Sequence, residues 1–249
     1  MSTLTEIVHY TDTLLQNSNF KDYCPNGLQV EGAPEVKRII SGVTASQALL
    51  DVAVQKNADM VLVHHGYFWK GDKPTITGMQ RQRIATLLEH NISLLAYHLP
   101  LDAHPELGNN VALAQQLELS IDAPLNSAGI GNLGHLASPM SATDFANHVE
   151  RCLSRAPILI TGDDRKIDKI AWCTGAAQNY MEQAIEAGAD AYLSGEISEQ
   201  TVHLARESGI HYIGAGHHAT ERYGVQLLAA EIAKKFDLQH EFVDIDNPV

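Results

Sequence analysis

The chain has 249 residues, of which 45% are hydrophobic and 6% aromatic, a composition typical of a globular protein with one large or two small domains. Its formal net charge of −13 excludes an extended nucleic-acid surface and a surface for acidic membranes, because both need a basic patch, but it allows a small phosphorylated ligand held by a metal. The three cysteines lack CxxC spacing, the amino terminus does not resemble a leader, and no apolar stretch approaches the roughly 20 residues of a membrane span, so we expect a reduced cytoplasmic protein.

The first predicted elements are a helix and a βαβ unit. Apolar residues at helical spacing predict an amphipathic helix over residues 3–15. Residues 38–62 then indicate a short apolar strand, a polar turn, a helix with Leu49, Leu50 and Ala53 on one face, and a second apolar strand. This order favours two parallel strands joined by a right-handed crossover.

A pair of histidines follows the second of these strands. His64 and His65 close the apolar run, and Gly66 comes next. Open α/β sheets place their chemistry at the carboxyl ends of strands, and neutral imidazole is the commonest metal ligand. Adjacent residues of an extended segment point opposite ways, so the two imidazoles could serve different ions, or one could bind while the other packs. For a single pair, the alternative is a polar strand end that faces water.

The next segments are a loop and a strand that also ends in histidine. We expect the loop at 68–78 to shape access to the strand ends before it. Residues 92–98 are an apolar strand ending in His98, and Asp102 lies four positions further on. A helix is predicted over 109–117.

The second half of the chain repeats the first. Residues 169–193 align with residues 38–62 without a gap at an offset of 131, as the positions of Asp59 and Asp190 show. The match predicts a second βαβ unit. Two unrelated βαβ units can look alike, but an ungapped match over 25 positions favours a duplication.

The end of the second half also parallels the first. The apolar strand at 210–216 leads into His217 and His218, and Glu221 lies four residues after His217, as Asp102 lies four after His98. The offset here is 119, which is 12 less than before, and we attribute the difference to an insertion at the loop after Gly66. A helix over 224–236 and a strand over 240–245 are predicted to follow.

The predicted fold is therefore α/β, with two related halves from an internal repeat. We place the halves at 1–126 and 127–249, joined near residues 120–140, where small and turn-forming residues gather at 123–131. The carboxyl-terminal helix and strand are expected to pack back on the first half. Ligands favour domain interfaces, so we expect the site in the cleft between the halves.

The chemistry-bearing residues at the predicted strand ends favour two metal ions. They comprise five imidazoles and two carboxylates: His64, His65, His98, Asp102, His217, His218 and Glu221. A single tetrahedral zinc uses at most four protein ligands, whereas two ions about 3.5–4 Å apart with a bridging carboxylate would use more. The mixed nitrogen and oxygen donors fit Zn, Mn, Fe(II), Ni or Co better than Ca or Mg.

Together these motifs resemble the Nif-three-like dinuclear metal proteins, which are also called GTP cyclohydrolase 1 type 2 homologs. The similarity runs from about Tyr23 to the carboxyl terminus and is to the short bacterial branch of the family. The segments that carry it are Asn26-Gly27-Leu28-Gln29-Val30, Gly42-Val43-Thr44-Ala45-Ser46, His64-His65-Gly66, His98-Leu99-Pro100-Leu101-Asp102, Gly195-Glu196 and Gly216-His217-His218-Ala219-Thr220-Glu221.

The resemblance implies a metal ligand set and an assembly. One ion would be held by His65 and Asp102, the other by His64 and His217, and Glu221 would bridge them. The resemblance also implies two divalent ions per chain and a cytoplasmic, ring-shaped homohexamer with its metal sites facing an internal cavity.

The remaining polar residues near these motifs have open roles. Glu196 occupies the repeat position of His65, so it is either a general base or a solvated turn residue. His98 is a candidate catalytic or ligand-orienting residue. His218 is expected to be a hydrogen-bonded strand-end histidine, and His104 is a candidate for substrate contact. We assign the other histidines to structure or surface: His9, His90, His135, His148, His203, His211 and His240.

The leading functional hypothesis is a metal-dependent hydrolase. If the family's name describes this chain, a metal-activated water would attack C8 of the purine ring of GTP, followed by ring opening and loss of formate. No Walker-type loop is present, and the phosphate candidates are Lys70, Lys73 and Arg222. A phosphoesterase or amidohydrolase would use the same metals. The alternative from another class is a metal-binding scaffold or regulatory interaction protein without turnover.

Overall fold

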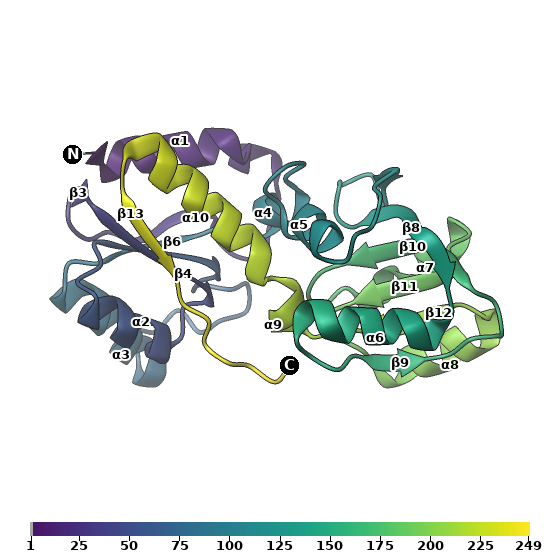
Figure 1. Cartoon of the computed structure of the whole chain (residues 1–249). Coiled ribbons are helices and arrows are strands. Elements are labelled where there is room, and N and C mark those ends of the chain that lie inside the picture. The colour runs from purple at the N-terminus through teal and green to yellow at the C-terminus, as the bar shows by residue number, and fades with distance from the viewer. Residues whose placement is uncertain (1) are drawn as a thin grey trace. The chain divides into compact units, whose positions relative to one another are not determined.

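The computed structural model describes residues 2–249, which form two compact α/β units (Figure 1). The first unit extends to Leu101 and also includes Val225–Asp246, and the second comprises Asp102–Gly224 and Asn247–Val249. The predicted α/β class is confirmed. The boundaries of these units differ from those of the halves 1–126 and 127–249, because the first unit ends earlier, at Leu101, and also includes the late segment Val225–Asp246.

The first unit is built on a five-stranded sheet with the strand order β13–β4–β5–β6–β2. In that order the strands are β13 (Gln239–Phe242), β4 (Arg38–Thr44), β5 (Met60–His65), β6 (Ser93–Ala96) and β2 (Gly27–Val30). Only β2 runs antiparallel to its neighbour. A separate antiparallel pair joins β1 (Ser2–Thr3) to β3 (Glu35–Val36). The residues that follow β4, β5 and β6 therefore lie at one edge of the sheet.

Helices cover both faces of this sheet. Figure 1 shows α1 (Leu4–Leu14) and α10 (Arg222–Phe236) along one face, and α2 (Gln47–Gln55) and α3 (Gly78–Glu89) along the other. Two smaller helices are η1 (Asn17–Asn19) and α4 (Leu99–Ala103). Helix α1 begins at a capping box in which Thr3 and Glu6 each accept a backbone N–H. The helix predicted over 3–15 is thus confirmed to within a residue at each end.

The second unit contains a six-stranded sheet with the strand order β7–β8–β10–β11–β12–β9. In that order the strands are β7 (Ala123–Pro124), β8 (Asn132–Met140), β10 (Ile167–Cys173), β11 (Ala191–Ser194), β12 (His211–Gly214) and β9 (Ile158–Ile160). The central strands β10, β11 and β12 are parallel, and the others are antiparallel to their neighbours. β8 thus occupies much of the region 120–140 that the sequence indicated as a linker, and only the turn at 125–131 fits that description.

Six helical segments belong to the second unit: α5 (Asn109–Gln116), α6 (Ala142–Leu153), η2 (Gln178–Tyr180), α7 (Met181–Glu186), α8 (Glu199–Ser208) and α9 (His217–Thr220). The helix predicted over 109–117 is confirmed as α5. Within residues 2–249, no helix combines the length and apolar character needed to cross a membrane.

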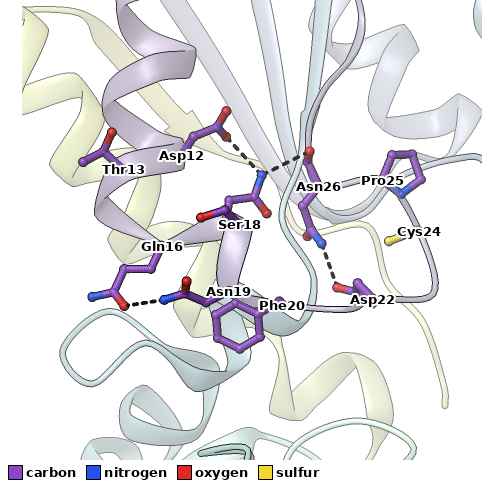
Figure 2. A pocket seen from close by; sticks show the side chains of 11 residues that line it. Asp12, Thr13, Gln16, Ser18, Asn19, Phe20, Asp22, Cys24, Pro25 and Asn26 are labelled. Atoms are coloured by element: carbon purple, nitrogen blue, oxygen red, sulfur yellow. Dashed lines mark hydrogen bonds between the residues drawn. The ribbon is translucent and has the colours of Figure 1, made fainter.

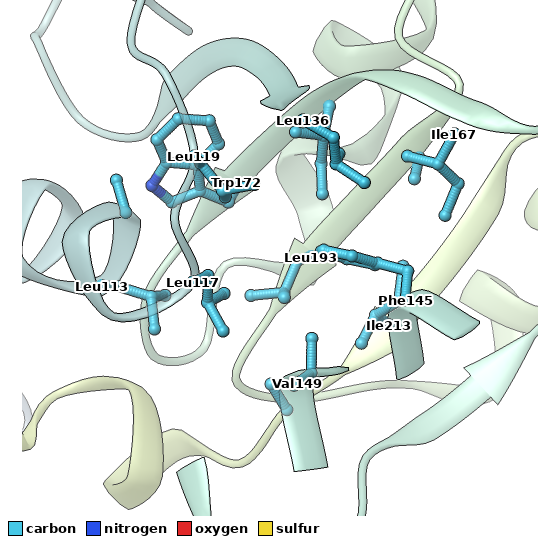
Figure 3. Packing of buried hydrophobic residues seen from close by; sticks show 14 of the residues in the cluster. Leu113, Leu117, Leu119, Leu136, Phe145, Val149, Ile167, Trp172, Leu193 and Ile213 are labelled. Carbon is cyan, nitrogen blue, oxygen red and sulfur yellow. The ribbon is translucent and has the colours of Figure 1, made fainter. Parts of the chain in front are cut away.

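The core of the second unit lies between its sheet and the helices α5 and α6. Figure 3 shows Trp172, Leu193 and Ile213, on the three parallel strands, packed with Phe145 and Val149 of α6. The indole N–H of Trp172 donates to the carbonyl oxygen of Asn110 at 2.9 Å, so this buried polar atom is satisfied. The contact fixes the start of α5 against the sheet.

The two parallel strand sets share their order and their first register. Ile39 pairs with Met60 in the first sheet, and the residues 131 positions later, Ile170 and Ala191, pair in the second. The last parallel pairing has an offset of 118, because Met60 pairs with Ser93 and Ala191 with His211. The offset of 119 between His98 and His217 therefore includes one extra residue after β12.

The matching aspartates make the same contacts in both units. Asp59 Oδ2 accepts the backbone N–H groups of Lys37 and Arg38 at 2.8 and 2.9 Å. Asp190 Oδ2 accepts those of Asp168 and Lys169 at 3.1 and 3.0 Å. Each carboxylate thus holds the start of the preceding strand. These shared contacts support the proposal that the units arose by duplication.

Candidate metal centre

The first candidate ligands lie at the carboxyl end of β5. The imidazole of His64 is fully buried, and its Nδ1–H donates to the carbonyl oxygen of Tyr97 at 2.8 Å. This bond directs the lone pair of Nε2 away from the backbone, which is the usual arrangement of a metal-binding histidine. His65 is less buried, and its Nδ1 lies 3.2 Å from the hydroxyl of Thr44.

His98 joins this pair within the first unit. One ring nitrogen from each of His64, His65 and His98 lies within 4.8 Å of the others. His98 Nδ1 is 2.7 Å from Asp22 Oδ1, and the backbone N–H of Leu99 donates to Asp22 Oδ2 at 2.9 Å. Asp22 therefore fixes both the ring of His98 and the start of α4.

Asp22 is ionised beside His98, and its charge affects the neighbouring thiol of Cys24. Burial raises the pKa of the Asp22 carboxyl, but hydrogen bonds from His98 and Asn26 outweigh it and lower the pKa to about 2. Burial and the charge of Asp22 raise the pKa of the Cys24 thiol to about 12. Cys24 lies within 4.8 Å of Asp22 and His98, but as a protonated thiol at neutral pH.

A polar cavity of about 740 Å³ adjoins these groups in the first unit (Figure 2). Asp22, Cys24 and Asn26 line it from one side, and Asp12 and the residues after α1 line the other. Figure 2 shows the side chain of Asn26 turned toward Asp22, to which it donates a hydrogen bond. The cavity thus adjoins the carboxyl group that contacts His98.

The charge of Asp22 should contribute to stability in a pH-dependent way. Its folded pKa lies below the unfolded value of 3.8, so the contribution is present above that value and is lost as the pH falls through about 2. We expect Asp22→Asn to lower the free energy of unfolding by about 2 kcal/mol at pH 7, and by much less at pH 2. Urea unfolding of metal-free protein at both pH values measures this, and a difference that stays constant with pH would contradict it.

The second unit carries a cluster of its own around His217, at the start of α9. His217 Nδ1 is 2.7 Å from Glu196 Oε1, and His217 Nε2 is 3.1 Å from Glu221 Oε2. Burial lowers the pKa of His217, but Glu221 and Glu196 raise it more, to about 9. In the metal-free chain, an imidazolium thus supplies positive charge among carboxylates.

Asp102 lies in the same cluster. One of its carboxylate oxygens is within 4.8 Å of an oxygen of Glu221, and both residues are buried, at 7% and 3% exposure. Asp102 Oδ1 accepts hydrogen bonds from Asn109 Nδ2 at 2.9 Å and Thr174 Oγ1 at 3.4 Å. Two buried carboxylates this close repel each other, so the arrangement favours a bound cation.

Gly175 makes room for the cluster. Its φ of +68° is in the left-handed region, and a Cβ built there would lie 2.1 Å from Glu221 Oε1 and 3.2 Å from His217 Nε2. The carbonyl oxygen of Gly175 accepts the backbone N–H groups of Gly195 and Glu196, which fixes the turn that carries Glu196. Only glycine lets the loop after β10 approach Glu221 so closely.

The structure thus brings the sequence candidates into two groups, one in each unit. His64, His65 and His98 gather in the first, and Asp102, Glu196, His217 and Glu221 gather in the second. His218 is mostly buried, at 9% exposure, and its backbone N–H donates to the carbonyl oxygen of Val249. His104 Nδ1 accepts from the backbone N–H groups of Glu106 and Leu107, which gives it a role in its turn.

Sequence reasoning missed several supporting residues. Asn109 and Thr174 bond Asp102, Asp22 bonds His98, and Gly175 admits Glu221. Asn109 begins the helix that the sequence does predict, but its partner lies in a different segment. A polar side chain at the first position of a helix that follows a candidate ligand is the one available signal, and it is too common to use alone.

The donor chemistry fits divalent transition metals. Imidazole nitrogens oriented by backbone or hydroxyl groups and buried carboxylates are ligands that Zn, Mn, Fe(II), Ni and Co accept. The protonated, buried cysteines do not add thiolates, because burial raises the pKa of both Cys24 and Cys173. The chain therefore carries several His, Asp and Glu groups that could hold a metal.

Named relatives cover nearly the whole chain. A Pseudomonas aeruginosa protein named GTP cyclohydrolase 1 type 2 homolog is 59% identical over 248 residues, with 98% of each chain covered. A protein of the same name from Allochromatium vinosum is 49% identical over 249 residues, covering 100% of this chain and 98% of the relative. Both relatives carry this name.

Solved structures and a family comparison agree with this. A structure described as protein ybgI, of unknown function, aligns with a TM-score of 0.96 at 46% identity, and TTHA1606 from Thermus thermophilus aligns with 0.92 at 31%. Both alignments cover 100% of each chain. Residues 2–248 match the family described as Duf34/NIF3 (NGG1p interacting factor 3). This chain is a member of the Duf34/NIF3 family.

Proposed function

We propose that this protein is a dinuclear metal-dependent hydrolase acting on a purine nucleotide or a related compound. His65 and Asp102 would hold one ion, His64 and His217 the other, and Glu221 would bridge the two. The observation that carries the proposal is the complementary chemistry of the two units. The first gathers oriented imidazoles, and the second gathers buried carboxylates with His217.

Chain connectivity supports a site shared by both groups. The chain passes from the first unit to the second between Leu101 and Asp102, and it returns between Gly224 and Val225. His98 is four residues before Asp102, so their Cα atoms are at most about 14 Å apart however the units are placed. Glu221 lies three residues before the return. Candidate ligands therefore lie within a few residues of both points where the chain passes from one unit to the other.

The chain's own residues would hold and orient the ligands. Tyr97 fixes His64 through its carbonyl oxygen, and Asn109 and Thr174 fix Asp102. Glu196 accepts from His217 Nδ1, which favours a positioning role over that of a free general base. His98, with its Nδ1 on Asp22, is placed to hold or move a proton at Nε2 beside His64 and His65.

When bound, a pair of divalent ions lowers the pKa of water to about neutral and so supplies a nucleophile at pH 7. The relatives are named for GTP cyclohydrolase, so GTP is the first substrate to test, with release of formate as the readout. Other purine nucleotides are the second choice, because the same donors suit a phosphoesterase or an amidohydrolase.

The test is a nucleotide screen on protein loaded separately with Mn, Fe(II) or Zn. We expect metal-dependent release of formate, or of another product, from at least one nucleotide, and a loss of more than about 100-fold in Glu221→Gln. His203→Ala is the matched control, because this exposed histidine pairs with Glu199 on α8 and belongs to neither ligand group. No turnover by any metal-loaded form, with two ions retained per chain, would favour a metal-binding scaffold.

The proposal also includes location and assembly. The family resemblance implies a cytoplasmic protein and a ring-shaped homohexamer. The acidic net charge of −13 is consistent with a small-molecule substrate and with the absence of an extended nucleic-acid surface.

A further inference from the structure

A second cavity of the first unit lies beside His65. It measures about 440 Å³, and its lining includes His65 and Trp69, Lys73 of the loop and Arg83 of α3. A volume in the range of about 300–1,000 Å³ is typical of small-molecule sites. The loop predicted from the sequence as an insertion, 68–78, thus forms one wall of a pocket that opens at a candidate metal ligand.

The charge of this pocket differs from that of the chain. Lys73 and Arg83 line it together with a single carboxylate, Asp72, so its fixed charge is positive although the chain carries −13. Asp72 Oδ2 already accepts the backbone N–H of Trp69 at 2.9 Å. Both cations are therefore available to an anion that enters the pocket.

Arg83 has an unmet hydrogen-bonding requirement. Its Nε atom is buried and has no hydrogen-bond partner among residues 2–249. A guanidinium that lacks hydrogen-bond partners within the chain is suited to bind an anion that enters the pocket it lines. The first turn of α3 adds donors, because its N-cap residue, Thr77, lines the pocket and makes no capping hydrogen bond with its side chain.

The aromatic residues of the pocket lining suit a flat ring. The Trp69 and His65 rings lie with centroids 5.9 Å apart, and the Trp69 and His98 rings are 5.0 Å apart. The indole N–H of Trp69 donates to the carbonyl oxygen of Gly66 at 3.2 Å, which holds the indole in place beside His65. An aromatic ring stacked there would lie next to the candidate metal ligands.

We propose that this pocket binds the anionic end of the substrate, with Lys73 and Arg83 contacting its phosphate and Trp69 contacting its ring. The inference rests on the proposed function, in which the reacting atom lies at the metal ligand His65. It narrows the substrate class to compounds that carry a phosphate or similar anion on one side of a flat heterocycle. A neutral nucleoside would lack the contacts at Lys73 and Arg83.

The test measures binding rather than turnover. Metal-free protein is titrated by calorimetry with GTP, guanosine and inorganic triphosphate, each at low and high salt. We expect GTP to bind at least about 10-fold more tightly than guanosine and its affinity to fall with salt. Arg83→Gln and Lys73→Gln should each weaken GTP binding by about 10-fold or more and leave guanosine binding unchanged.

Two control variants are matched to these changes. Arg81→Gln alters a cation on the same helix, and Lys37→Gln alters an exposed lysine elsewhere in the first unit, and neither residue lines the pocket. We expect both to bind GTP like the unaltered chain. Lys73 is exposed, so Lys73→Gln keeps the test valid if Arg83→Gln fails to fold.

The outcomes separate this inference from the proposed function. Equal GTP affinity in Arg83→Gln, Lys73→Gln and the controls, or no binding of any anionic compound, would overturn the inference and leave a metal-dependent turnover standing. Weaker binding in both pocket variants, without turnover of any nucleotide by metal-loaded protein, would support the pocket and count against the hydrolase.

Discussion

Replacing Glu221 by alanine is expected to leave a folded chain that no longer retains two ions. Glu221 is 3% exposed, lies 3.1 Å from His217 Nε2 and is the residue proposed to bridge both metals. Changes to partners that only orient a ligand typically cost 10–100-fold in metal affinity, so the loss of a bridging ligand should exceed about 100-fold. Elemental analysis after dialysis should give one ion per chain or fewer, compared with two for the unaltered protein.

The control for this change is Glu207→Ala, which removes an exposed carboxylate from α8. It should retain the full metal content. His64→Ala provides an independent test, because it removes a ligand from the first unit and should likewise lower the metal content. Two ions retained in both Glu221→Ala and His64→Ala would refute the ligand assignment, provided that circular dichroism shows both variants folded.

Gly175→Ala should disrupt the same centre without removing any ligand. The added Cβ would lie 2.1 Å from Glu221 Oε1, and the backbone φ of +68° is unfavourable for alanine. The strained backbone costs about 1 kcal/mol, and displacing a buried carboxylate adds to it, so we expect a destabilisation of about 2–4 kcal/mol. Urea unfolding of the metal-free variant measures the stability, and elemental analysis of loaded protein should show reduced metal content.

Gly188→Ala separates the two effects. Gly188 has nearly the same φ, +70°, but a Cβ there would meet nothing within 4 Å. Its variant should show only the backbone cost, about 1 kcal/mol, and normal metal content. If Gly175→Ala is no worse than Gly188→Ala in stability and in metal content, the close approach of Gly175 to Glu221 is not a requirement of the site.

The sequence predicts the candidate metal ligands better than the residues that hold those ligands by hydrogen bonds. His64, His65 and His98 lie at strand ends, and a strand end is visible as the point where an apolar run stops. The bond between Asp22 and His98 joins residues 76 apart, and that between Thr174 and Asp102 joins residues 72 apart. Such pairs follow from tertiary packing, and periodicity within one segment carries no information about them.

The dependence on tertiary packing also explains why the sequence missed the strand β8. The parallel strands of the two βαβ units are readable because each has a helix at short range with an apolar face. β8 resembles part of a linker in the sequence because Gly134, Ala137 and Ser138 hide its alternation, and its pairing with β10 depends on a distant segment. Positions of short polar strands are set by their neighbours in the sheet rather than by their own composition.

The pairing of β13 with β4 has a consequence for how the chain is made. Gln239 pairs with Arg38, 201 residues earlier, so the first sheet lacks one of its strands until residue 239 has left the ribosome. During that time the edge of β4 exposes unpaired backbone groups, which promote association with other chains. A nascent chain stalled before residue 239 should therefore depend on chaperones, even when its second unit is already complete.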